Sequence, residues 1–118
     1  MKKVQDALAP TGIPAYANGW KKTAAPPTAP DKYMVYTTMR TEDFHADDAL
    51  LHYRVYVYLN LWTRGDPTDD IRAVRAAMYA AGFWMSEERD SYEDDTDNTL
   101  ISWTWVCWEE AEQDAVDH

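Results

Sequence analysis

The sequence contains few of the residues on which several common kinds of site depend. Its single cysteine, Cys107, excludes a disulfide within the chain. Its four glycines are isolated at positions 12, 19, 65 and 82, which excludes a glycine-rich phosphate-binding loop. It also lacks a run of about eighteen apolar residues that could span a bilayer, and its first residues lack the apolar stretch of a signal peptide. We therefore expect a cytosolic protein that does not enter a membrane and is stabilised by packing.

Basic residues are scarce in the last third of the chain. Residues 84–118 hold twelve Asp and Glu residues against Arg89 alone, a net charge of −11, whereas residues 1–83 hold nine acids and ten bases, a net charge of +1. Binding DNA phosphates requires Lys and Arg side chains that displace counterions, so this region is poorly suited to it. The charge fits a DNA-repelling surface or a surface for a basic partner.

The chain does contain ample material for one hydrophobic core. It has 118 residues, 46% of them hydrophobic, with six Trp and eight Tyr. This length predicts a single domain over residues 1–118. Within it, the prolines of residues 11–31 predict an extended or polyproline-like arm, with Tyr16 and Trp20 as apolar anchors. Residues 109–118 are acidic and predict a frayed helix or a disordered tail.

Hydrophobic periodicity predicts two helices and four strands. A two-turn helix is expected before Pro10, and strands are expected at 33–42, 51–63, 83–91 and 100–108. A polar loop at 42–48 and an acidic turn at 93–98 would join the strands into two hairpins. The sequence therefore predicts an α+β fold in the order helix-strand-strand-helix-strand-strand. The sheet is expected to be mixed or antiparallel, with the helices packed on one face.

Signals at both ends mark the second helix. Asp66 followed by Pro67 is typical of an N-cap and the first helical residue, and Gly82 is suited to the left-handed conformation that ends a helix. Helical spacing divides its small and apolar residues into two stripes. The first holds Ile71, Val74, Met78 and Ala81, and the second holds Ala73, Ala76, Ala77 and Ala80. Two sides of this helix can therefore pack closely.

The polar residues do not assemble into a recognisable chemical site. His45 and His52 lie near Asp43, Asp47 and Asp48 but lack the fixed spacing of metal motifs, and a solvated hairpin tip is the simpler interpretation. The acidic run at 93–97 resembles a calcium loop only in charge. Cys107 lies among tryptophans and next to acids, which suits a core residue better than a nucleophile. We expect no catalytic residue, no cofactor and no metal.

Aromatic residues are more numerous than one small core requires. Tyr56, Tyr58 and Trp62 share one face of a predicted strand, and Trp103, Trp105 and Trp108 lie on another strand. Stacking on nucleic-acid bases is normally accompanied by basic grooves, whereas the neighbouring charge here is acidic. Packing against another subunit is therefore the better interpretation. The predicted subunit interface consists of Tyr56, Tyr58, Trp62, Ala73, Ala76 and Ala80.

The order of elements resembles that of the tail terminator (tail completion) proteins of long-tailed bacteriophages. Four stretches carry the resemblance: the long strand at 53–62, the helix opening Asp66-Pro67-Thr68, the helix end at 78–83, and the segment 92–96 before the last strand. It covers about residues 33–108 and includes no catalytic signature. The arm at 11–31 is not part of it.

This resemblance implies a structural virion protein and not an enzyme. The protein would form a ring, expected to be a hexamer, at the head-proximal end of the tail tube, where it stops tube polymerisation and offers the head-docking surface. Its partners would be further copies of itself, the tail tube protein and the head-completion (stopper) protein of the connector. DNA would pass through without specific binding, past an acidic lumen or partner surface formed by Glu93, Asp94, Asp95 and Asp97. The protein would lie at the head-tail interface of the virion, and in the host cytoplasm during assembly.

An acidic DNA mimic or inhibitor that occupies a basic enzyme cleft is the alternative. The small size of this chain and its charge of −10 fit such an inhibitor as well as they fit a tail terminator. Mimicry requires carboxylates spaced like phosphates along an exposed surface, whereas the acids of this chain concentrate in a turn and a tail.

Overall fold

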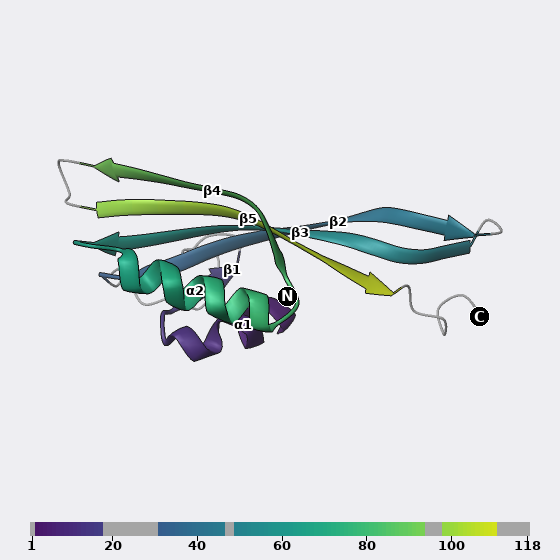
Figure 1. The fold of residues 1–118 in the computed structure, drawn as a ribbon, viewed down its shortest axis with the longest axis horizontal. Coiled ribbons are helices and arrows are strands. Elements are labelled where there is room, and N and C mark those ends of the chain that lie inside the picture. Colours follow the sequence, from purple (N-terminus) through teal and green to yellow (C-terminus); the bar gives the residue numbers. More distant parts are fainter. Residues whose placement is uncertain (1, 18–30, 47–48, 94–97, 111–118) are drawn as a thin grey trace.

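The computed structural model describes residues 2–17, 31–46, 49–93 and 98–110, which form a five-stranded sheet with its helices on one face (Figure 1). The elements in chain order are α1 (Lys2–Leu8), the 3-10 turn η1 (Ala9–Thr11), β1 (Ala15–Ala17), β2 (Tyr33–Ala46), β3 (Ala49–Arg64), α2 (Thr68–Ala80), β4 (Trp84–Glu93) and β5 (Asn98–Glu110). The strand order is β1-β2-β3-β5-β4, with β1 parallel to β2 and the other neighbours antiparallel.

The predicted order of elements was wrong, because the arm contributes a strand. β1 lies between α1 and β2, so the order is helix-strand-strand-strand-helix-strand-strand, and strands make up most of the described chain. The N–H of Met34 donates to the carbonyl of Pro14 at 2.7 Å, and the Gln5 side chain donates to the carbonyl of Ala15 at 3.0 Å. Three residues are too few to show an alternating pattern, and the partners that hold β1 come from elsewhere in the chain.

The predicted loop at 42–48 was also too long. β2 continues to Ala46 through register shifts between Glu42 and Phe44 and between Phe44 and His45, and β3 begins at Ala49. A β-bulge places an extra residue in one strand, so it disturbs the alternation by which a strand is identified from sequence. The antiparallel pairing of these two strands confirms the predicted hairpin. It runs on past the helix layer at one end of the molecule (Figure 1).

Other predicted boundaries lie close to the observed ones. β4 and β5 pair as the predicted antiparallel hairpin, and α1 ends before Pro10 as expected. β5 extends to Glu110, so the predicted tail begins with two strand residues, and residues 111–118 lie outside the described part. Trp20, one of the predicted anchors of the arm, also lies outside it.

The core lies between the sheet and the two helices. Alternate residues of β3, from Val55 to Leu61, are 0–1% exposed and pack with Val74 and Met78 of α2. Val4 and Leu8 of α1 complete this layer and are also 0–1% exposed. Burial of these side chains supplies most of the driving force for folding. The period-two pattern of β3 therefore decides which face of the sheet the helices cover.

Hydrogen bonds satisfy both ends of α2. The Asp66 carboxylate accepts bonds from the N–H of Thr68 at 3.0 Å and from its hydroxyl at 2.6 Å, which lowers the pKa of Asp66. Pro67 precedes the helix and is not its first residue, one position away from the prediction. At the other end, Gly82 has φ of +90°, as predicted, and the N–H of Phe83 donates to the carbonyl of Met78 at 3.0 Å. This is a Schellman motif.

Replacing Gly82 by alanine should destabilise the protein. No atom lies within 4 Å of an added Cβ, so the cost is the left-handed backbone itself, roughly 1 kcal/mol in the free energy of unfolding. Urea denaturation would measure it. Gly82→Asn is the matched control, because asparagine adopts this conformation more readily, and it should lose less stability than Gly82→Ala. Equal stability of the alanine variant and the wild type would contradict this role of Gly82.

Candidate assembly surface

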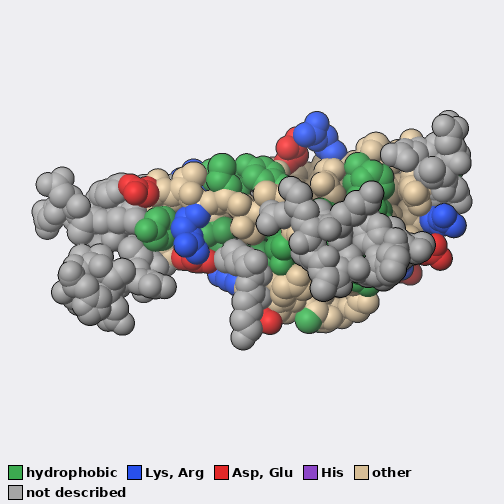
Figure 2. All heavy atoms as spheres, turned by 180° about the vertical axis from the view of Figure 1, so that it is seen from behind, with side chains coloured by type: hydrophobic (Ala, Val, Ile, Leu, Met, Phe, Trp, Pro, Cys, Tyr) green, Lys and Arg blue, Asp and Glu red, His purple; other side chains and the backbone are tan. Residues whose placement is uncertain are grey.

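One face of the sheet is not covered by any described helix. Four of its large apolar side chains remain well exposed: Met39 at 44%, Tyr58 at 42%, Trp84 at 64% and Trp108 at 47%. We refer to this side of β2, β3, β5 and β4, opposite α1 and α2, as the open sheet face. Seen from behind, the molecule shows hydrophobic side chains at the surface in several groups (Figure 2). Exposed apolar groups of this size are typical of surfaces that bind another protein.

A row of apolar side chains crosses the open sheet face from edge to edge. Met39 of β2 pairs with Tyr56 of β3, Tyr56 pairs with Val106 of β5, and Val106 pairs with Trp84 of β4. Residues at paired positions point to the same face of a sheet, so the register places these four side chains side by side. The row draws on all four long strands and depends on tertiary pairing.

A groove of about 280 Å³ lies along part of this row. We call it the aromatic groove; it is lined by Arg54, Tyr56, Trp84, Met85, Ser86, Val106 and Trp108. Val106 is only 9% exposed and neighbours the more exposed Trp84 on β4 and Trp108 on β5. The Arg54 guanidinium donates to the Tyr56 hydroxyl at 3.2 Å, which orients both polar groups at the groove. Trp, Tyr and Arg are the residue types that contribute most to protein-protein binding energy.

The strand half of the predicted interface lies on the open sheet face. Tyr58 is exposed, while Tyr56 and Trp62 are partly buried. The rings of Tyr56 and Tyr58 stack with centroids 6.5 Å apart and an interplanar angle of 12°. Sequence reasoning missed Arg54 and Trp84 as parts of the same surface. The period of β3 places Arg54 beside Tyr56, but only the pairing of β4 with β5 brings Trp84 to them.

The three tryptophans of β5 do not share one surface. Trp103 and Trp105 are 2% and 0% exposed in the core, whereas Trp108 lies in the aromatic groove. Odd and even positions of a strand point to opposite faces, so Trp108 is separated from the other two by the sheet. They cannot form one platform for stacking bases.

The helix half of the predicted interface lies on the other side of the molecule. Ala76 and Ala80 are exposed on α2, and Ala73 is partly buried. Ala77, from the same predicted stripe, is 8% exposed and belongs to the core. Because α2 covers the face opposite the aromatic groove, the structure does not bring the two halves together. The two predicted halves of the interface therefore lie on opposite sides of the described chain.

The acidic candidates divide between described and undescribed residues. Glu93 is the last residue of β4, at the end of the sheet opposite the β2-β3 turn (Figure 1). Asp94, Asp95 and Asp97 lie outside the described residues. Glu109 lies near the far end of β5, where its carboxylate accepts a bond from Arg40 at 2.7 Å. The acidic last third of the sequence thus reaches both ends of the sheet.

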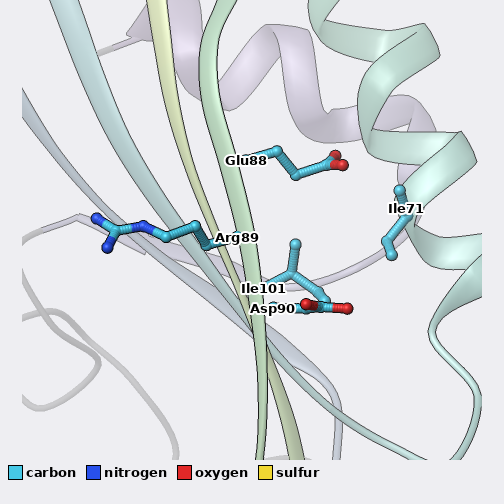
Figure 3. Close-up of a pocket in the computed structure, with 5 residues that line it drawn as sticks. All are labelled: Ile71, Glu88, Arg89, Asp90 and Ile101. Atoms are coloured by element: carbon cyan, nitrogen blue, oxygen red, sulfur yellow. The ribbon is translucent and has the colours of Figure 1, made fainter.

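An arginine-glutamate-tryptophan contact fastens α2 to the sheet. Glu88 of β4 points toward α2, whereas its neighbour Arg89 points away (Figure 3). The Glu88 carboxylate accepts two bonds from Arg75, one of them at 2.9 Å from Nε, and a third from the Trp103 indole N–H at 2.5 Å. The bond from Arg75 is the main cause that lowers the pKa of Glu88, and the Trp103 bond lowers it further. Arg75 was predicted only as part of a polar flank.

The described residues contain little that suggests chemistry at a single centre. Cys107 is 1% exposed, and burial raises the pKa of its thiol, as befits a core residue. In the described ranges no three His, Cys, Asp or Glu side chains are grouped as a metal ion would need. The side chains of Asp43 and His45, and residues 47–48, lie outside the described part. None of the described helices is long and apolar enough to span a membrane.

The fold and the aromatic groove define a small sheet protein with one helix-covered face and one face suited to binding protein. No protein-family model and no curated protein matches the chain. Among solved structures, it is similar to a chain described as "Virion of native gene transfer agent (GTA) particle". The TM-score is 0.57 at 14% sequence identity, over 93% of this chain and 90% of that chain. At this identity the likeness shows a shared fold.

Replacing Glu88 by glutamine should weaken the attachment of α2 and lower the free energy of unfolding at neutral pH by roughly 1–2 kcal/mol. Because the pKa of Glu88 is lowered from its ordinary value of 4.5, its contribution is complete above that pH and is lost as pH falls through the folded-state pKa. The difference between wild type and variant should therefore shrink in acid.

Denaturation at pH 7 and at successively lower pH would measure this difference. Glu87→Gln is the matched control: Glu87 is exposed and lies 3.2 Å from the exposed Arg89. It should change the free energy of unfolding much less. A Glu88→Gln effect that is independent of pH would argue against the ionised contact.

Proposed function

We propose that this protein is a structural component of a phage-like virion, a tail terminator that acts by assembly and not by catalysis. Copies of the chain form a ring, a hexamer by the family resemblance, at the head-proximal end of the tail tube. The ring stops polymerisation of the tube protein and provides the surface to which the head-completion protein docks. The protein assembles in the host cytoplasm and remains in the virion.

The placement of two candidate contact surfaces on opposite sides of the chain carries this proposal. A symmetric dimer uses the same patch on both subunits, whereas contact between two different patches continues from subunit to subunit and closes into a ring when the rotation allows. The aromatic groove and the outer side of α2 are two such patches. The fold shared with a chain of a gene transfer agent virion supports the assignment to a virion.

Passage of DNA through the ring agrees with the charge of the chain. A formal charge of −10 leaves few basic groups to hold phosphates, so DNA slides without specific binding. The acidic turn that begins at Glu93 is the proposed lumen or partner surface. Several described carboxylates are in ion pairs, including Asp70 with Lys32 at 2.8 Å, which disfavours a DNA mimic with free carboxylates.

Electron microscopy of particles that lack this protein tests the role directly. In the phage or phage-like particle whose genome encodes the chain, its deletion should give overlong tails without heads, and expression of the wild-type chain should restore particles. Tails of normal length joined to heads would overturn the proposal.

Charge reversal at Asp94, Asp95 and Asp97 should leave tails of normal length but impair head joining or DNA ejection, if these residues line the lumen.

Ala76→Arg and Ala80→Arg test the helix surface. Each places a long charged side chain on an exposed position of α2, so the fold should persist while the ring is lost. Light scattering would separate a ring of about 82 kDa, six times the 13.6 kDa chain, from a monomer, with or without tail tubes. Ala9→Arg, also at an exposed alanine, is the matched control and should leave the ring intact.

Intact rings in both α2 variants would contradict this use of the helix. A wild-type chain that stays monomeric even with tail tubes, and that binds a basic enzyme, would instead support an inhibitor.

A further inference from the structure

The aromatic groove has the composition of a binding site for an extended, proline-containing segment. Trp84 lies across from Val106 on β4, and Trp108 lies two residues along β5; both are exposed. Tyr56 and Arg54 line the same groove from β3. Grooves lined by aromatic rings bind proline-rich chains, because proline rings pack flat against indole and phenol rings and the polyproline conformation costs little entropy to order.

We propose that the aromatic groove receives residues 18–30 of a neighbouring copy of this chain, the part of the arm at 11–31 that follows β1 and holds Pro26, Pro27 and Pro30. The arm contains the sequence Pro27-Thr28-Ala29-Pro30, preceded by Pro26. Two prolines separated by two residues lie on the same side of a polyproline helix, which has three residues per turn. Pro27 and Pro30 would then face the tryptophans of the groove.

Charge favours the same occupant. Residues 18–30 include Lys21 and Lys22 and no acidic residue. Next to the groove, β4 carries the exposed Glu87, which shares its charge with the exposed Arg89 at 3.2 Å, and residues 84–118 as a whole have a net charge of −11. A basic arm on an acidic strand is electrostatically complementary.

The reach of the chain indicates that the arm comes from a neighbour. Trp108 of β5 pairs with Arg54 of β3, and Arg54 pairs with Thr41 of β2. Trp108 therefore lies two strands across the sheet from Thr41, and Thr41 lies eight residues along β2 from Tyr33. At about 3.3 Å per residue and 4.8 Å per strand, that separation is roughly 28 Å. Pro27 is six residues from Tyr33 and can reach at most about 21 Å, and Pro30 about half of that. The prolines therefore fall short of Trp108 in their own subunit.

This inference rests on the proposed ring for the presence of a neighbour, and it names the segment that one subunit lends to the next. A few residues can contribute most of the binding energy at an interface. An arm that binds to such residues links adjacent subunits without a larger rigid interface.

Disulfide trapping between two different variants tests the contact. One chain carries Thr28→Cys and is labelled with ¹⁵N; the other carries Ser86→Cys, at the aromatic groove, and is unlabelled. When the two are mixed and mildly oxidised, mass spectrometry should detect a mixed dimer joined between these positions. The wild-type chain controls for Cys107, which is 1% exposed. A chain with Ala9→Cys, at an exposed site away from the groove, should give little mixed dimer with Thr28→Cys.

Two sets of variants test whether the mixed dimer depends on the tryptophans of the groove and on the prolines of the arm. Adding Trp84→Ala and Trp108→Ala to the Ser86→Cys chain should reduce the mixed dimer about tenfold or more, as should Pro27→Ala and Pro30→Ala in the arm. Both tryptophans are well exposed, so their removal should leave the circular dichroism spectrum of the folded chain unchanged. Loss of the edge contact between the Trp84 and Tyr79 rings, whose centroids are 6.3 Å apart, should lower the melting temperature only slightly.

A yield equal to that of Ala9→Cys, or one insensitive to both sets of variants, would overturn the inference. Its failure is distinguishable from failure of the proposed function. Overlong tails in the deletion with no trapped dimer would retain the tail role and reject the arm contact. A trapped dimer together with normal tails in the deletion would retain the arm contact and reject the tail role.

Discussion

The alternation of side chains along β3 is the constraint on which the rest of the structure depends. β3 pairs with β2 on one side and β5 on the other, so its register determines that of both neighbours. From Val55 to Leu61 its odd positions are buried under the helices, while Tyr56 and Tyr58 point to the open sheet face. A slip of one residue would exchange the two faces and place tyrosine hydroxyls in the core. Both the fold and the aromatic groove follow from this one pattern.

The two faces of the sheet are used differently. The helix-covered face is closed by packing and by the contact of Glu88 with Arg75 and Trp103, which joins α2, β4 and β5. The open sheet face keeps large aromatic side chains at the surface, where their burial would stabilise an assembly instead of the monomer. A chain that presents this face and an alanine-rich helix on opposite sides is suited to the head-to-tail contacts of the proposed assembly. That proposal would account for the aromatic residues that the core does not use.

Local signals predicted most elements but not their number or their extent. The long strand at β3, the end of α2 at Gly82 and both antiparallel hairpins were recognisable, because each depends on residues close together in the chain. β1 escaped prediction because three residues are too few to show a period. The last four residues of β2, 43–46, escaped it because the bulge interrupts the alternation. The outward side of Ala76 and Ala80 followed from helical spacing, whereas burial of Ala77 depended on how α2 sits on the sheet.

The sequence by itself determined which residues share a strand face, where α2 ends and how charge is distributed, since periodicity, glycine and charge are local properties. Only the tertiary structure decided that Trp84, from the strand after α2, meets Tyr56 and Val106 in one row. It also decided that Trp105 is buried while Trp108 is exposed, and that the two predicted halves of the interface lie on opposite sides. The physical reason is that strand order, register and helix placement arise from hydrogen bonds and packing between residues far apart in the chain.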